Sequence, residues 1–315
     1  MENRRHFLKH IALTGAFLPL VSTSIFGKLA NVTLPRHPLC YFTKHLQWLG
    51  IEDLAIVLKS AGFDGADLTI RPGGHIDPAK AGQQLPTAVA TLQKHGLAVP
   101  MAVTNISDAG GEGIDDLLKA LADNGVMYYR MGYFDYDHGM SIEKNVSSFR
   151  EQLKKLEEKN ANYRIWGGYQ NHAGTRFGAS LWDLAAALQG LDPVHIGCQF
   201  DIRHAVYEGA RSWENDLRQI KEYVKTTVVK DFYWEKDLNG KWTHHNCQMG
   251  EGMVDFDRYF ELFKALEIPG PVSNHSEYEL IKKEEEGLPK NKKMDIAIER
   301  LKKDVELSKK YLNRI

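Results

Sequence analysis

Two kinds of segment, strand-like and helix-like, alternate along the chain from about residue 39 to its end. Short runs rich in β-branched and aromatic residues, bounded by polar or glycine-containing segments, are typical of strands. We expect eight strands, at residues 39–44, 65–71, 98–105, 126–132, 164–171, 194–201, 226–233 and 271–278.

Amphipathic stretches separate these runs, with apolar residues spaced three and four apart as on one face of a helix. Clear examples lie at 51–62, 85–96, 113–125, 146–160 and 254–267. Gly62, Gly96 and Gly125 close three of them, at the position that a helix C-cap favours. The pattern therefore predicts strands that alternate with helices.

Eight such alternations indicate a parallel sheet, and their number fits a single (β/α)8 TIM barrel over residues 28–315. An open doubly wound sheet is the alternative, although no GxGxxG motif follows the first strand. Residues 235–252 are interpreted as one long loop. The charged stretch 282–293 is interpreted as a solvated loop before the last helix.

The N-terminus has a different character from the rest of the chain. A basic segment with the pair Arg4–Arg5 precedes an apolar run from Ile11 to Phe26, which is typical of an export signal and too short for a membrane span. The arginine pair indicates a twin-arginine-type signal. We expect residues 1–27 to be removed and the mature domain to be periplasmic, without a stable membrane span. An uncleaved N-terminal anchor is the alternative.

Charge and cysteine content exclude several classes of function. Lys and Arg number 40 against 41 Asp and Glu, a net charge of −1, so no nucleic-acid partner is implied. Cys40, Cys198 and Cys247 are too far apart in sequence for a CxxC metal site, and they do not form a disulfide framework. Nothing in the sequence indicates the oligomeric state.

Polar residues gather where the predicted strands end, which is where a TIM barrel carries its active site. Such residues are costly in a barrel interior unless they are paired or bind a ligand, so their concentration predicts a site. They are Arg71, His75, Asn105, Arg130, Gln170, His172, Asp201, Arg203, His204, Lys230, His275 and Glu277.

Three of these residues have a structural interpretation as well. Asp201 can cap the next helix, Arg130 can pair with a carboxylate inside the barrel, and Lys230 can form an ion pair with the adjacent Asp231.

The motif order resembles the sugar phosphate isomerase/epimerase family, the xylose-isomerase-like barrels. The resemblance rests on DLTIRPGGHIDP (67–78), YQNHAG (169–174), FDIRHA (200–205), VVKDFYW (228–234), MGEGMVDF (249–256) and PVSNHSEYEL (271–280). It implies a TIM barrel that binds a sugar, with a divalent metal at the barrel mouth. The family holds this metal with a glutamate, an aspartate, a histidine and a glutamate on strands five to eight.

The resemblance transfers only one of these ligands unchanged. The four positions fall on Gln170, Asp201, Val228 and His275, and the family's substrate-contacting histidine corresponds to His204. The implied metal site is therefore Gln170, Asp201 and His275, with His172 or Glu277 near enough to help. Such oxygen and nitrogen donors suit Mn²⁺, Zn²⁺ or Co²⁺.

These replacements alter the chemistry that the resemblance implies. Family epimerases use two glutamates, but an amide at Gln170 cannot act as a general base. We therefore expect one-base proton abstraction next to the carbonyl of a sugar or keto-sugar, leading to isomerisation or to lyase/hydratase chemistry on a 3-keto-glycoside. Lys230, His275 and Glu277 are the candidate catalytic residues, and Lys230 could instead be a cation that stabilises an enediolate.

The remaining candidates are interpreted as substrate-binding residues. Charged and polar side chains suit sugar hydroxyl or anionic groups, and an aromatic ring can stack on a sugar face. This set is Arg71, His75, Asn105, Arg130, His172, Arg203, His204 and Trp234. The alternative function is a non-catalytic carbohydrate-binding barrel with a degenerate metal site.

Overall fold

The computed structural model describes residues 34–315, so the predicted export signal at residues 1–27 lies outside the described part. Eight parallel strands form a closed barrel in the order β1-β10-β7-β6-β5-β4-β3-β2, which confirms the TIM barrel and excludes the open sheet. These strands are β1 (Leu39–Phe42), β2 (Gly65–Thr69), β3 (Ala98–Val103), β4 (Tyr128–Arg130), β5 (Trp166–Gln170), β6 (Ile196–Asp201), β7 (Val224–Val229) and β10 (Val272–Asn274).

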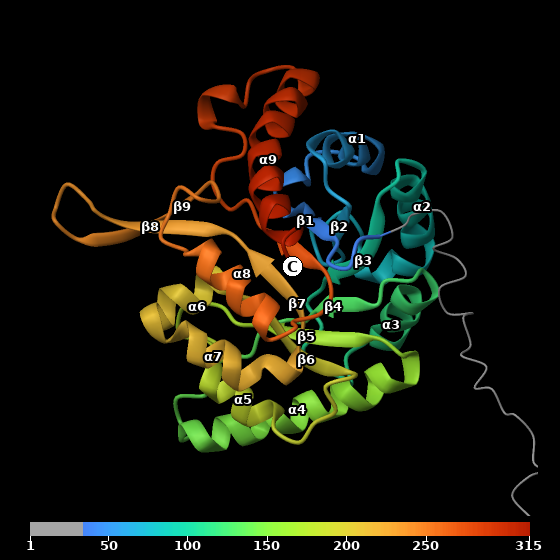
Figure 1. Ribbon diagram of the computed structural model, residues 1–315. Coiled ribbons are helices and arrows are strands. Elements are labelled where there is room, and N and C mark those ends of the chain that lie inside the picture. The colour runs from blue at the N-terminus through green and yellow to red at the C-terminus, as the bar shows by residue number, and fades with distance from the viewer. Residues whose placement is uncertain (1–33) are drawn as a thin grey trace, which may run out of the picture. The chain divides into compact units, whose positions relative to one another are not determined.

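Helices surround the barrel (Figure 1). They are α1 (Ile51–Ala61), α2 (Ala81–Lys94), α3 (Ile114–Asp123), α4 (Ile142–Tyr163), α5 (Leu181–Leu188), α6 (Ile202–Gly209), α7 (Trp213–Ile220), α8 (Phe256–Ala265) and α9 (Lys290–Leu312). The predicted C-cap at Gly62 is confirmed, with a φ of 98° and backbone hydrogen bonds to Leu58 and Lys59. Across residues 34–315, no helix has both the length and the apolar character that crossing a membrane requires.

A hairpin replaces most of the loop predicted at residues 235–252. Strands β8 (Asp231–Lys236) and β9 (Trp242–Cys247) pair antiparallel, and the hairpin extends away from the barrel (Figure 1). Its turn is closed by Asp237, whose carboxylate accepts hydrogen bonds from the backbone of Asn239 and Lys241. The loop prediction was wrong because the chain leaves β7 and continues directly into a second extended segment.

The carboxylate of Asp231 holds the segment that follows this hairpin. One oxygen accepts backbone hydrogen bonds from Phe232 at 2.8 Å and Val254 at 3.1 Å. The other accepts from Gly250 and Gly252, both at 2.9 Å. A Cβ atom at Gly252 would collide with this carboxylate, so glycine is required there. Asp231 is therefore an anchor for the 249–254 loop.

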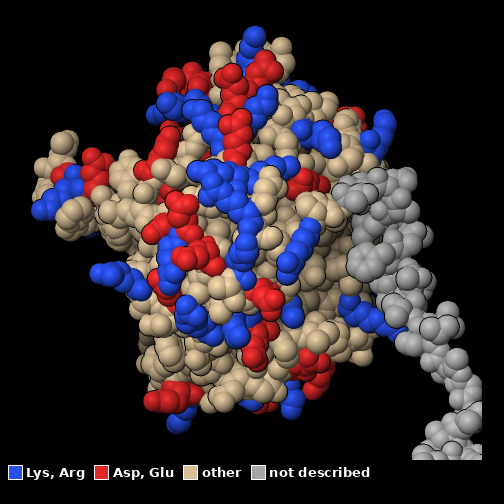
Figure 2. Space-filling view, in the orientation of Figure 1, with Lys and Arg blue, Asp and Glu red and all other residues tan. Residues whose placement is uncertain are grey.

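Charged side chains of both signs are interspersed over the face seen in Figure 2. This distribution matches the nearly balanced count of basic and acidic residues in the sequence. The buried polar groups at the C-terminal ends of the barrel strands are therefore the more informative feature for function.

Candidate functional site

A cavity of about 290 Å³ opens at the C-terminal ends of the barrel strands. Larger hollows of about 460 and 470 Å³ occur elsewhere, but the strand-end cavity is the one that contains the buried Lys230 and His275. Its lining comes from many elements around the barrel: Phe42, Lys44, Arg71, Asn105, Arg130, Tyr133, Gln170, His172, Arg176, Lys230, His275 and Glu277.

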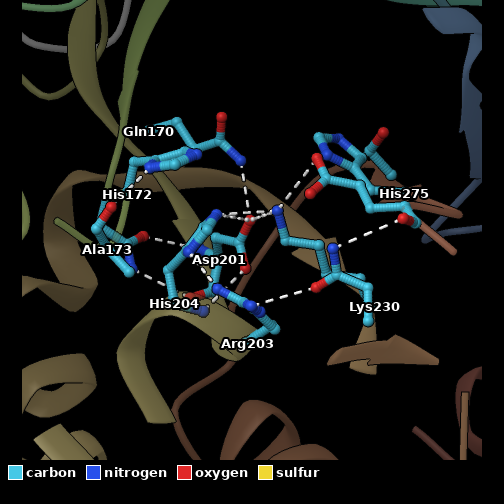
Figure 3. A network of polar contacts seen from close by, with 12 residues as sticks. Gln170, His172, Ala173, Asp201, Arg203, His204, Lys230 and His275 are labelled. Carbon is cyan, nitrogen blue, oxygen red and sulfur yellow. Dashed lines mark hydrogen bonds and ion pairs between the residues drawn. The ribbon is translucent and has the colours of Figure 1, made fainter. Parts of the chain in front are cut away.

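Barrel register places the central residues side by side. Asp201 at the end of β6 is level with Val228 on β7, and Val228 is level with Ser273 on β10. Since side chains on one face of a strand recur every two residues, Lys230 and His275 follow Val228 and Ser273 on the same faces. Asp201 and Lys230 therefore meet at the C-terminal end of the barrel, and His275 lies beyond the Lys230 amine (Figure 3).

Asp201 has both of the roles that its sequence position suggested. Its Oδ1 accepts a hydrogen bond from the backbone N–H of His204 at 3.1 Å and so caps helix α6. Its Oδ2 accepts from Nε2 of Gln170 at 2.8 Å and lies 3.1 Å from Nζ of Lys230. The Asn171 side chain fixes the Asp201 backbone through two further hydrogen bonds. One fully buried carboxylate thus ends a strand, caps a helix and pairs with Lys230, which lines the cavity.

Gln170 has a defined amide orientation. Its Oε1 accepts hydrogen bonds from the Tyr133 hydroxyl at 2.7 Å and from Nη1 of Arg130 at 3.2 Å, and its Nε2 donates to Asp201. A guanidinium group can only donate, so the amide oxygen must face Arg130. Gln170 therefore points an N–H, and not its oxygen, toward Asp201.

The side chains of the predicted metal site are oriented in a way that does not suit a divalent ion. Gln170 directs its oxygen away from Asp201, and His275 lies on the far side of the Lys230 amine from both (Figure 3). Within residues 34–315, no group of three or more His, Cys, Asp or Glu side chains could hold a metal ion. Val228, at the family's histidine position, is buried and apolar. The donor set present does not fit a divalent metal, because the Gln170 amide presents an N–H to Asp201 and the Lys230 amine lies beside the same carboxylate.

The Lys230 amine contacts three side chains that lie far from it in the sequence. Its Nζ lies 2.8 Å from Nε2 of His204, 3.1 Å from Asp201 and 3.5 Å from Oε1 of Glu277. The alternative pairing of Lys230 with Asp231 is wrong, because the Asp231 carboxylate is occupied by backbone N–H groups.

His204 lies between two cationic side chains. Its Nδ1 is 3.1 Å from Nη1 of Arg203, while its Nε2 is 2.8 Å from Lys230. A neutral imidazole has one acceptor nitrogen, whereas a guanidinium and an ammonium group can only donate, so the ring can accept a hydrogen bond from Arg203 or from Lys230 but not from both. Burial, followed by the charge of Lys230, holds the pKa of His204 well below its ordinary value. The ring is therefore neutral near pH 7.

His275 is buried at the edge of the cavity without a hydrogen-bond partner on either ring nitrogen. Its ring lies 4.3 Å from that of Phe42, and its Nε2 is 3.8 Å from Oδ2 of Asp67. Burial, and then the charges of Lys230 and Arg130, lower the pKa of His275 well below its ordinary value. A neutral imidazole with a free acceptor nitrogen can take up a proton from a bound ligand.

The two carboxyl groups near His275 have opposite pKa shifts. Burial raises the pKa of Asp67 to about 7, although the hydrogen bond from Ser273 opposes this shift. Burial also acts to raise the pKa of Glu277, but the charges of Lys230 and Lys44 outweigh it and lower the pKa to about 2. Glu277 is therefore ionised near pH 7, whereas Asp67 is partly protonated.

Four of the eight predicted substrate-binding residues line the cavity, two lie directly behind it, and two lie elsewhere. Arg71, Asn105, Arg130 and His172 line it, while Arg203 and His204 support Lys230 and Asp201 from behind. His75 and Trp234 are not among the lining residues.

Local contacts explain why these two residues stay away. The His75 ring contacts the Thr69 hydroxyl at 3.1 Å, because the loop after β2 folds back on its own strand. Trp234 lies on the hairpin and packs on Tyr207, with 4.9 Å between the ring centroids.

Sequence reasoning missed Lys44, Asp67, Tyr133 and Arg176. Lys44, Tyr133 and Arg176 line the cavity from segments beyond the strand ends, where period-two alternation no longer predicts direction. Asp67 could have been found from the sequence, because it is an acidic residue in the middle of the predicted strand segment GADLT on β2.

The raised pKa of Asp67 predicts a pH-dependent stability. A carboxyl group that is easier to protonate in the folded state favours folding at low pH, and this contribution is lost as the pH rises from about 4 to about 7. Asp67→Asn removes that loss. We expect the unfolding free energy of the variant, relative to wild type, to rise by up to about 1.4 kcal/mol per pH unit in this window and to stay level above it. Urea unfolding at several pH values measures it, and a difference that does not change with pH would contradict the assignment.

The chain belongs to the family described as the xylose isomerase-like TIM barrel, which matches residues 56–304. The family resemblance inferred from the motifs is thereby confirmed. A comparison with curated proteins finds no match.

Solved structures share the fold at low sequence identity. One is 3-keto-D-glucoside 4-epimerase YcjR from E. coli, with 16% identity, a TM-score of 0.59, and coverage of 84% of this chain and 98% of that chain. Another is the probable 3-DHS dehydratase AsbF from Bacillus anthracis, with 15% identity, a TM-score of 0.63 and coverage of 86% and 98%. D-allulose 3-epimerase from Methylomonas sp. has 15% identity, a TM-score of 0.62 and coverage of 89% and 99%.

Proposed function

We propose that this protein is a periplasmic enzyme that removes a proton next to the carbonyl group of a sugar or keto-sugar. One observation carries the proposal: the same cavity is lined by the His275 imidazole, which is neutral and has no hydrogen-bond partner, and by the Lys230 amine. Proton abstraction next to a carbonyl needs both a base and a positive group near the oxygen where charge develops.

The reaction follows from these two groups. His275 takes the proton from the carbon next to the carbonyl, and the C–H electron pair becomes the C=C bond of an enediolate. The carbonyl electron pair moves onto oxygen, where the Lys230 ammonium stabilises the negative charge. Return of the proton to the former carbonyl carbon, with transfer of the O–H proton of the neighbouring hydroxyl group to the former carbonyl oxygen, completes an isomerisation. Departure of a substituent from the β-carbon with its bonding electrons instead completes an elimination.

The remaining cavity residues suit a polyhydroxylated substrate. Arg71, Asn105 and Arg130 offer hydrogen-bond donors, and the ionised Glu277 offers an acceptor. A volume of about 290 Å³ is near the lower end of the ~300–1,000 Å³ usual for ligand pockets, which suits a single sugar ring. An elimination is compatible with the substrate of one structural neighbour, the 3-keto-D-glucoside 4-epimerase. In a 3-keto-glucoside, the carbon that carries the glycosidic oxygen adjoins the carbon with the acidic C–H, so that oxygen can leave.

A panel of keto-glycosides in D₂O tests the function directly. We expect ¹H NMR to show loss of one C–H signal next to the carbonyl, with or without release of the aglycone. His275→Gln should abolish this exchange while binding persists, because it removes the base and keeps a polar side chain of similar reach. Binding of the panel without any exchange in the wild-type protein would contradict the proposal and favour the carbohydrate-binding barrel.

A further inference from the structure

We propose that the ammonium group of Lys230 occupies the place of a divalent cation in this barrel, as a positive charge covalently tethered to the chain. The inference deepens the proposed function by naming the group that holds the substrate's oxygen atoms. The role of the cation in catalysis rests on the proposed function, whereas its position rests on the contacts of Lys230 alone.

The surroundings of Nζ are those of a bound cation. Three groups from three different elements surround it: Nε2 of His204 at 2.8 Å, Oδ2 of Asp201 at 3.1 Å and Oε1 of Glu277 at 3.5 Å. Figure 3 shows the first two beside the Lys230 amine. The carboxylates of Asp201 and Glu277 form ion pairs with the ammonium group, and the His204 ring makes its shortest contact. Lys230 is only 3% exposed, and a charge at such depth requires opposite charges of this kind.

Neighbouring side chains support a tethered cation and oppose a free one. The amide of Gln170 donates an N–H to Asp201 and so uses part of the carboxylate's capacity to accept. Arg130 and Tyr133 hold that amide in place through its oxygen. A divalent ion at Asp201 would therefore lie beside an N–H donor and within a few ångströms of the Lys230 charge, which would repel it.

A tethered cation at Lys230 explains all three departures from the family's ligand pattern. Gln170, Val228 and His275 stand where the resemblance places a glutamate, a histidine and a glutamate, so the two carboxylates and one ligating imidazole are missing together. Lys230 is two residues beyond Val228 on the same face of β7 and reaches back to Asp201. A cation supplied by the chain needs fewer carboxylates than a divalent ion.

Metal binding to the purified full-length protein tests the inference without a substrate. After equilibration with ZnCl₂ or MnCl₂ and dialysis, we expect wild-type protein to retain no equivalent of metal by elemental analysis. Lys230→Ala removes the charge between Asp201, Glu277 and His204, so these three groups, which hold no metal as they stand, can turn toward a Zn²⁺ ion in the place of Nζ. This variant should retain about one equivalent and show a Zn²⁺-dependent rise in Tm.

Lys44→Ala is the matched control, because Lys44 lines the same cavity but has no ion pair with Asp201. It should gain no metal, and any weak binding by the exposed His244 and His245 should be equal in all three proteins. Wild-type protein that retains one equivalent overturns the inference, whether or not Lys230→Ala folds. A folded Lys230→Ala protein that gains no metal also overturns it. Neither result bears on proton exchange, which tests the proposed function separately.

Discussion

Lys230→Met is expected to lower the turnover of a keto-sugar substrate by roughly 10²–10³-fold, the range for removal of one group that stabilises a developing negative charge. Methionine preserves the length and most of the volume of lysine but carries no charge. The effect should fall on kcat more than on KM, because the charge on the substrate oxygen is larger in the transition state than in the bound substrate. Steady-state kinetics on the substrate found by NMR measure it.

A second substitution separates this effect from misfolding. Lys230→Met leaves the buried Asp201 without its ion-pair partner, which typically costs about 3–5 kcal/mol. The double variant Lys230→Met with Asp201→Asn removes both charges, and we expect it to regain much of the stability but none of the turnover. Kinetics of Lys230→Met within a few fold of wild type would remove Lys230 from the mechanism.

Asp231→Ala is expected to lower the free energy of unfolding by roughly 3–5 kcal/mol, because four backbone N–H groups lose their common acceptor. The segment that it holds, residues 249–254, connects the hairpin to α8. Urea denaturation followed by circular dichroism measures the change. Asp231→Asn keeps one acceptor oxygen and should lose about half as much.

Asp237 provides the matched control for this experiment. It also accepts hydrogen bonds from two backbone N–H groups, but it lies in the exposed turn of the hairpin, where water can replace it. Asp237→Ala should therefore cost less than about 1 kcal/mol. Equal losses for Asp231→Ala and Asp237→Ala would show that Asp231 is not the anchor of the loop.

The periodicity of the sequence was sufficient for the barrel and for the general location of the site. Eight apolar runs alternating with amphipathic stretches have few other packed solutions, and parallel strands must bring their C-terminal ends to one face. That is why Arg71, Asn105, Arg130, His172 and His275 could be assigned to one cavity before any contact was known. Strand alternation also predicted which residues face inward, because its period is fixed by backbone geometry.

Only the tertiary structure decided which of these side chains touch. The adjacent Asp231 is near Lys230 in sequence, yet barrel register brings Lys230 to Asp201, and backbone donors take up Asp231. The orientation of the Gln170 amide likewise depends on Arg130 and Tyr133, which come from another strand and its loop. A contact between different strands is set by register and by competition among donors, and neither is written in the local sequence around any one residue.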